Sequence, residues 1–169
     1  IGEVLELHEG LPKKAARARA ITLLARTGIP SPELRVDFYP HQLSGGQRQR
    51  AMIAMALACR PKLLICDEPT TALDVTVQAQ ILALLEELQR EIGMALLFIT
   101  HDLNLVRRFT DRVGVMERGK LVEIGATEAV FSDPQHAYTR RLLATWPERV
   151  VQALAPTAEV LVQAREVRV

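Results

Sequence analysis

The sequence predicts an α/β domain in which strands of a parallel sheet alternate with helices. Two short, continuous apolar runs, KLLIC at 62–66 and ALLFIT at 95–100, are typical of strands that are buried on both faces of such a sheet. Between them, the residues from Val75 to Ile92 carry apolar side chains at helical spacing, and Gly93 ends that helix. The order of strand, helix and strand therefore favours a parallel α/β unit.

The chain ahead of the first strand is predicted to be mostly helical. Residues 1–10 form one expected helix. A second runs from Pro12, which suits the first turn of a helix, to a stop at Gly28. The basic side chains on that second helix are interpreted as a solvated face. Residues 31–42, SPELRVDFYPHQ, are expected to form a loop.

Beyond the second strand, the chain alternates between short helices and strands. DLNLVRRF at 102–109 predicts a helix, and RVGVME at 112–117 predicts a third strand of the unit. An Arg-Gly pair at 118–119 then turns the chain into KLVEIG, which gives a hairpin. Two more short helices are expected over 126–134 and 136–145.

The composition is that of a soluble globular domain. With 49% hydrophobic residues, 24% charged residues and a net charge of +1, the 169-residue chain gives no reason to expect nucleic acid or an anionic membrane as a partner. An aromatic content of 4% argues against a surface that stacks exposed bases. Cys59 and Cys66 lie in apolar company and are interpreted as small buried side chains in a reducing compartment. No apolar run approaches the roughly 20 residues that span a bilayer.

Both ends of the chain look like cuts through a longer protein. It begins at Ile1 without a methionine and ends on VLVQAREVRV at 160–169, which alternates like a strand in mid-pattern. The residues before that segment, 147–159, resemble a linker. We therefore expect the start of a further domain at the end of the chain.

Two adjacent acids stand where the first predicted strand ends. Functional sites of open parallel sheets lie at the carboxyl ends of the strands, which is where Asp67 and Glu68 fall. An aspartate there can hold Mg²⁺ through water, and a glutamate beside it can polarise an attacking water as a general base. On its own, such a pair is more often two solvated side chains.

A glycine turn opens the third predicted helix, in the sequence LSGGQ at 43–47. Ser44 and Gln47 fit a capping box, while Gly45 and Gly46 let the backbone come close to a ligand. The first turn of the helix then points its free N–H groups at that ligand, which suits a phosphate. The plainer interpretation is a capped helix after a glycine turn.

His101 follows the second predicted strand, so it falls on the same edge of the sheet as Asp67 and Glu68. In that place it could donate a hydrogen bond to a phosphate oxygen. The commoner role of a lone histidine in such a position is to cap the helix that follows it.

Together, these segments resemble the ABC-type ATPases. LSGGQ is similar to the signature motif of that family, LLICDE at 63–68 to its Walker B strand, TTALD to the D-loop that ends at Asp74, and His101 to the switch histidine. Their order and spacing agree as well, from Ile1 to Trp146, so the combined pattern is far more specific than any one segment. The resemblance implies a P-loop NTPase fold with a parallel sheet core and a helical subdomain.

The resemblance also implies ligands and roles. In that family, two nucleotide-binding domains pair head to tail around two ATP molecules, so ATP, Mg²⁺ and a second such domain, fused or separate, are expected partners. Glu68 and His101 would be catalytic and Asp67 would hold the metal, all at the ATP of their own domain. The residues expected to bind nucleotide are Asp74 and, toward the ATP held by the other domain, Ser44, Gly45, Gly46 and Gln47.

A Walker A loop is not found in the sequence. GVMERGKL at 114–121 nearly fits its pattern, but Leu121 offers no hydroxyl to Mg²⁺, and a strand pattern follows where a phosphate loop must open a helix. Lys120 is therefore not interpreted as a nucleotide lysine. We expect a partial ABC ATPase domain that lacks the Walker A half and is inactive by itself.

The expected organisation places the C-terminal part of a nucleotide-binding domain at 1–146. Its helical subdomain would cover about 1–60 and its catalytic α/β part about 61–146. The linker at 147–159 would lead into a second nucleotide-binding domain that begins at 160–169.

The tail FSDPQHAYTRRLLAT at 131–145 resembles the C-terminal motif of ATPases that serve oligopeptide, dipeptide and nickel importers, although Ala137 replaces their usual proline. EPTTALDVTVQAQIL at 68–82 is typical of the same group. The resemblance implies an ATP-hydrolysing subunit that powers import of peptides or related small solutes. Its partners would be transmembrane permease subunits and, indirectly, a periplasmic or extracellular solute-binding protein, at the cytoplasmic face of the bacterial inner membrane.

Two other functions stay open at this point. A soluble ABC ATPase that acts on ribosomes or nucleic acid carries the same central motifs, and the tail at 131–145 favours transport over it. A catalytically silent binding module is disfavoured because Glu68 and His101 are both present.

Overall fold

The structure is a computed structural model that describes residues 1–71 and 73–145. These residues divide into two compact units, Ile1–Val106 and a second unit that begins at Arg107. The first unit holds most of the helices and a parallel pair of strands, and the second holds a hairpin and two helices. The linker and the further strand that the sequence predicts after residue 146 lie outside the described residues.

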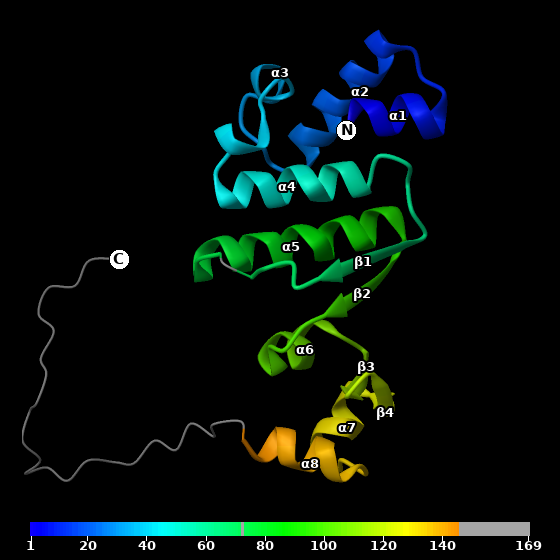
Figure 1. Cartoon of the computed structure of the whole chain (residues 1–169), viewed down its shortest axis with the longest axis vertical. Coiled ribbons are helices and arrows are strands. Elements are labelled where there is room, and N and C mark those ends of the chain that lie inside the picture. Colours follow the sequence, from blue (N-terminus) through cyan, green and yellow to red (C-terminus); the bar gives the residue numbers. More distant parts are fainter. Residues whose placement is uncertain (72, 146–169) are drawn as a thin grey trace, which may run out of the picture. The chain divides into compact units, whose positions relative to one another are not determined.

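Helices dominate the beginning of the first unit. They are α1 (Gly2–Glu9), α2 (Lys13–Arg26), α3 (Pro32–Arg35), the 3₁₀ turn η1 (Pro40–Gln42) and α4 (Gly45–Ala56). In Figure 1, α1, α2 and α3 lie on one side of α4, and α5 (Val75–Ile92) lies on its other side. A single apolar core runs through these layers and includes Leu5, Leu23, Ile53 and Leu85.

One helix prediction and one loop prediction are corrected by the structure. Pro12 is the N-cap of α2, with φ −61° and ψ 146°, so the helix itself begins one residue later. The stretch 31–42, expected to be a loop, contains α3 and η1. Both begin at a proline, Pro32 and Pro40, because the fixed φ of proline suits the first position of a helical turn.

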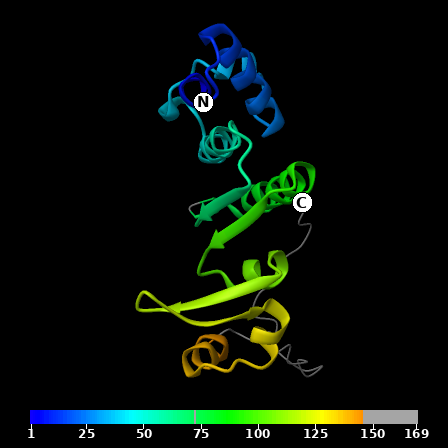
Figure 2. The same ribbon diagram turned by 90° about the vertical axis from the view of Figure 1, so that its right-hand side faces the viewer.

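The first unit also contains the predicted parallel strands. β1 (Leu63–Asp67) pairs with β2 (Ala95–Ile99) in parallel, with Leu63 opposite Ala95. α5 connects the two strands and packs along one face of the pair (Figure 2). The predicted order of strand, helix and strand is therefore confirmed.

The two faces of this sheet differ in exposure. Leu64 and Cys66 are buried against the helical core, where burial raises the pKa of the Cys66 thiol to about 11. The opposite face carries exposed apolar side chains, which are Leu63, Ile65, Leu97 and Ile99. The prediction that both faces are buried is therefore wrong for the part of the chain that the structure describes, because α5 covers one face and those four side chains stay exposed.

The first unit passes into the second through α6 (Leu103–Phe109). The second unit contains β3 (Arg112–Glu117), β4 (Lys120–Ala126), α7 (Thr127–Ser132) and α8 (Ala137–Ala144). Arg118 and Gly119 join the strands with φ of 52° and 76°, and two left-handed residues in a two-residue loop are typical of a type I′ hairpin turn. The predicted hairpin is confirmed.

This hairpin corrects the expectation of a third strand in the parallel sheet. β3 pairs with β4 in antiparallel fashion, and within the described residues the parallel sheet has two strands, β1 and β2. The two-residue turn folds the chain directly back along β3, which gives the antiparallel pair. Lys120 begins β4 rather than a helix, which agrees with the rejection of GVMERGKL as a phosphate loop.

Candidate functional site

The predicted catalytic residues meet at the carboxyl edge of the β1–β2 sheet. Asp67 is the last residue of β1, Glu68 follows it, and His101 comes two residues after the end of β2. His101 Nδ1 lies 2.9 Å from Glu68 Oε1. Because an ionised carboxylate only accepts hydrogen bonds, Nδ1 carries a proton and donates it in this pair. The expectation that Glu68 and His101 share one edge is met by this geometry.

The backbone at Glu68 is held in an unusual conformation. Its φ is 44°, in the left-handed region that residues other than glycine rarely adopt. The Glu68 N–H donates to the carbonyl of Ile99, the last residue of β2, at 2.8 Å, and this bond ties the strained residue to the neighbouring strand. Strain of this kind is found preferentially at functional sites, where the surrounding structure holds it in place.

The Glu68 carboxylate accepts two hydrogen bonds from side chains. His101 binds Oε1, and the hydroxyl of Thr71 donates to Oε2 at 2.8 Å. These two bonds, the one from His101 first, hold the pKa of Glu68 below its usual value. The carboxylate is therefore ionised at neutral pH and can act as a base.

His101 does not cap α6, which was the commoner role for a histidine at this place. The cap is Asp102, whose Oδ1 accepts the N–H groups of Asn104 at 2.9 Å and of Leu105 at 3.3 Å. The His101 ring is thus free to pair with Glu68, and it is 79% exposed.

The LSGGQ segment forms the capped start of α4. Ser44 is the N-cap: its Oγ accepts the N–H of Gln47 at 3.3 Å, and the Gln47 side chain accepts the N–H of Ser44 at 3.2 Å. This is the predicted capping box. Gly45 is exposed and Gly46 is partly buried, so the first turn of α4 presents bare backbone.

The two glycines pack against the segment that leads into α5. A Cβ on Gly46 would stand 2.8 Å from a methyl group of Val77, closer than real side chains approach, whereas one on Gly45 would meet Leu73 at an ordinary 3.6 Å. Asp74 caps α5, because its Oδ1 accepts the N–H of Val77 at 2.9 Å. The structure thus places the predicted signature segment beside the residues around Asp74.

Asp67 offers one exposed carboxylate at the strand end. Among the described residues, no group of three His, Cys, Asp or Glu side chains is arranged to hold a metal ion. Mg²⁺ does not need such a cage, since it keeps several waters and binds one or two carboxylates together with substrate phosphates. The donor set at Asp67 therefore fits Mg²⁺ bound jointly with a nucleotide.

The structure brings the predicted residues together in two groups rather than one. Glu68 and His101 hydrogen-bond to each other, and the LSGGQ segment lies beside Asp74. In the described part of the chain, no hydrogen bond or ion pair links one group with the other. Thr71 was not predicted, although its place three residues after Glu68, at turn spacing, was a usable signal.

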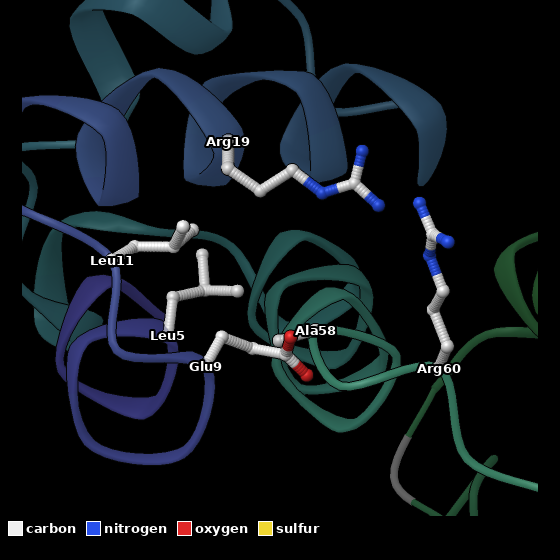
Figure 3. A pocket seen from close by; sticks show the side chains of 6 residues that line it. All are labelled: Leu5, Glu9, Leu11, Arg19, Ala58 and Arg60. Carbon is white, nitrogen blue, oxygen red and sulfur yellow. The ribbon is translucent and has the colours of Figure 1, made fainter.

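A separate pocket of about 370 Å³ lies among the helices of the first unit (Figure 3). Its lining residues are Leu5, Glu9, Leu11, Arg19, Ala58 and Arg60. Leu5 and Ala58 are buried and make its floor apolar. The guanidinium groups of Arg19 and Arg60 extend toward one side of it in Figure 3, and within the described residues neither forms an ion pair or a hydrogen bond through its side chain. The sequence did not predict this pocket.

The fold and the two groups of residues define the class of the protein as an ABC-type ATP-binding domain. Residues 3–71 match the ABC transporter family. The chain belongs to this family, and the order of its LSGGQ, Walker B and switch histidine segments agrees with that assignment.

Named relatives are similar to the chain over most of its length. It is 59% identical over 169 residues to the peptidoglycan transport ATP-binding protein YejF of Agrobacterium fabrum, covering 100% of this chain and 31% of that protein. It is 58% identical over 148 residues to the dipeptide transport ATP-binding protein DppD of Haemophilus influenzae, covering 88% of this chain and 45% of that protein. The chain therefore spans less than half the length of these relatives.

A solved structure supports the fold. The ATP-binding cassette MJ0796, described as a dimer in a post-hydrolysis state bound to ADP and Pi, has a TM-score of 0.59 and 33% identity. The match covers 69% of this chain and 49% of MJ0796. As to membranes, none of the helices in the described ranges has the length and apolar character needed to cross a bilayer.

Proposed function

We propose that the complete protein hydrolyses ATP to power import of peptides or related small solutes, and that residues 1–146 form the later part of its nucleotide-binding domain. In this proposal the helical subdomain covers about 1–60, the catalytic part about 61–146, and a linker at 147–159 leads into a second domain. The Glu68–His101 pair at the edge of the parallel sheet is the observation that carries the hydrolytic function.

Hydrolysis needs a base that positions and deprotonates water. Glu68 suits this role because it is ionised, 43% exposed and fixed in orientation by its partners. The water oxygen forms a bond to the γ-phosphorus and gives its proton to Glu68, while the bond to the bridging oxygen breaks and its electron pair leaves with ADP. Phosphoryl transfer depends mostly on positioning and charge stabilisation, so few side chains are required.

The remaining predicted residues contribute binding. Asp67 would hold Mg²⁺, which supplies positive charge to the phosphates when it is bound. The capped start of α4, Ser44 to Gln47, would bind a phosphate of the nucleotide held by a second domain, because its backbone N–H groups and the helix dipole favour an anion. Asp74 would contribute to nucleotide binding beside this segment. The dimeric MJ0796 neighbour supports a paired arrangement.

We propose that permease subunits dock at the pocket between α1, α2 and the end of α4. The guanidiniums of Arg19 and Arg60, unpaired within the described residues, outnumber the single carboxylate of Glu9, so the pocket carries net positive charge. With its apolar floor it suits a short permease segment that carries an apolar side chain and a carboxylate. Such docking would hold the protein at the cytoplasmic face of the inner membrane and link it indirectly to a solute-binding protein. The names of both relatives concern transport, which favours solute import over an action on ribosomes or nucleic acid.

A glutamine substitution tests the hydrolytic function. In the complete protein, Glu68→Gln keeps the shape of the side chain but removes the base, so we expect turnover to fall by about 10²–10⁴ while ATP binding is kept. Turnover would be measured by phosphate release and binding by calorimetry. Undiminished hydrolysis in this variant would show that the assigned role of Glu68 is wrong.

Charge reversal tests the docking pocket. Arg19→Glu and Arg60→Glu should weaken association with the permease and lower transport. The ATPase activity of the complete protein, measured without the permease, should stay the same. Lys14→Glu is the matched control, because Lys14 is exposed on the same helix and does not line the pocket. Equal effects of all three variants on co-purification with the permease would contradict the proposed site.

A further inference from the structure

Two adjacent threonines follow Pro69, and they differ in what they contact. The hydroxyl of Thr71 donates to Glu68 Oε2 at 2.8 Å, and its backbone N–H donates to the Glu68 carbonyl at 3.2 Å. Thr70 is partly buried, and its hydroxyl forms no hydrogen bond within the described residues. Thr71 is thus joined to Glu68 twice, through its side chain and through a tight turn of the backbone.

The Glu68 carboxylate has one donor on each oxygen. His101 Nδ1 lies 2.9 Å from Oε1, and Thr71 Oγ1 lies 2.8 Å from Oε2. The terminal torsion of a glutamate is broad, so a single donor leaves the plane of the carboxylate poorly defined. Two donors on opposite oxygens fix that plane, which matters here because the Glu68 side chain is 43% exposed.

We propose that Thr71 is a positioning residue for Glu68, whose hydroxyl fixes the carboxylate in the orientation that aims its free lone pairs at the attacking water. This rests on the proposed function, in which Glu68 is the base for ATP hydrolysis. The strained backbone at Glu68 sets the direction in which its side chain leaves the chain. The hydrogen bonds from the Thr71 hydroxyl and from His101 set the orientation of its carboxylate. A misplacement of about 1 Å in such a group can cost about 10² in rate.

The test compares substitutions that differ by one hydroxyl. Thr71→Val removes the donor and keeps the shape, Thr71→Ser keeps the donor, and Thr70→Val removes the neighbouring hydroxyl. In the complete protein, we expect Thr71→Val to lower kcat by about 10- to 100-fold with KM for ATP unchanged. We expect Thr71→Ser to restore most of that loss and Thr70→Val to behave like the natural protein.

Two results would overturn the positioning role. One is a kcat of Thr71→Val equal to that of the natural protein. The other is a kcat of Thr71→Ser as low as that of Thr71→Val, which would mean that side-chain shape rather than the hydroxyl matters. Calorimetric ATP binding by each variant confirms that the protein is folded.

Glu68→Gln separates this inference from the function on which it rests. If Glu68→Gln abolishes turnover and Thr71→Val leaves it unchanged, only the role of Thr71 is wrong. If Glu68→Gln hydrolyses ATP normally, the proposed function of Glu68 fails, and the role of Thr71 fails with it. When both single variants are slow, adding Thr71→Val to Glu68→Gln should cause no further loss, because Thr71 acts through that carboxylate.

Discussion

Two helix starts in this protein are built in opposite ways. At α8, a carboxylate from the protein lies at the approach to the helix: Glu123 on β4 accepts the N–H groups of Gln135 at 2.8 Å and of the N-cap residue His136 at 3.0 Å. At α4, the cap is neutral, made by Ser44 and Gln47, and within the described residues no carboxylate hydrogen-bonds to the first turn. Both helix starts favour an anion. The protein supplies its own anion at α8, whereas the glycine backbone at the start of α4 stays available to an external anion.

The largest expected effect concerns the glycines of α4. Gly46→Ala would place a Cβ 2.8 Å from a methyl group of Val77, whose β-branched side chain has one preferred rotamer in a helix, so α4 and α5 must separate. We expect a loss of about 1–3 kcal/mol in the free energy of unfolding, measured by urea denaturation of the complete protein.

Gly45→Ala is the matched control for that substitution, since its Cβ would meet Leu73 at an ordinary 3.6 Å. Val77→Ala combined with Gly46→Ala should recover part of the loss. Equal destabilisation by the two glycine variants would mean that close packing does not explain the second glycine of the motif.

A smaller effect is expected from the neutral cap itself. Ser44→Ala removes the oxygen that accepts the Gln47 N–H, and losing an N-cap of this type costs about 1 kcal/mol. Urea denaturation again measures the change. Ser44→Asp should restore the cap with a negative charge, and it should weaken nucleotide-dependent pairing of the domains because that charge repels phosphate. Unchanged pairing would argue against an anion at this helix start.

The smallest effect at neutral pH is expected at α8, and it depends on pH. The Thr139 hydroxyl beside Glu123, with the N–H groups of Gln135 and His136, holds the pKa of Glu123 below its usual value. A lowered folded-state pKa adds stability above the pKa of the unfolded chain, and that stability is lost as pH falls through the folded-state pKa. Glu123→Gln should therefore lower the melting temperature slightly at neutral pH and make it less sensitive to acid. A variant with the same acid sensitivity as the natural protein would contradict this role.

The sequence predicted those features that depend on local patterns. The capping box at Ser44, the span of α5 and the turn at Gly119 follow from short-range rules, and the structure agrees with each. The meeting of Glu68 with His101 also followed from the sequence, because parallel strands bring their carboxyl ends to one edge.

Features that depend on three-dimensional placement were not predicted. An apolar run such as KLLIC does not tell which faces of its strand are covered, so the exposed face of the sheet was missed. Turn spacing from Glu68 favours Thr71 over Thr70, but the side-chain hydrogen bond itself depends on the left-handed backbone at Glu68, which the sequence does not show. The pocket at Arg19 and Arg60 joins residues that are far apart in the chain.

The chemical reactivity of the buried cysteine of β1, Cys66, reports local opening of the protein. With a pKa of about 11, the Cys66 thiol is almost entirely protonated at neutral pH, and it is 7% exposed between the sheet and the helical core. An alkylating reagent can therefore modify it only when α5 and β1 come apart. In a variant that lacks the more accessible Cys59, the rate of alkylation would measure how often that layer opens.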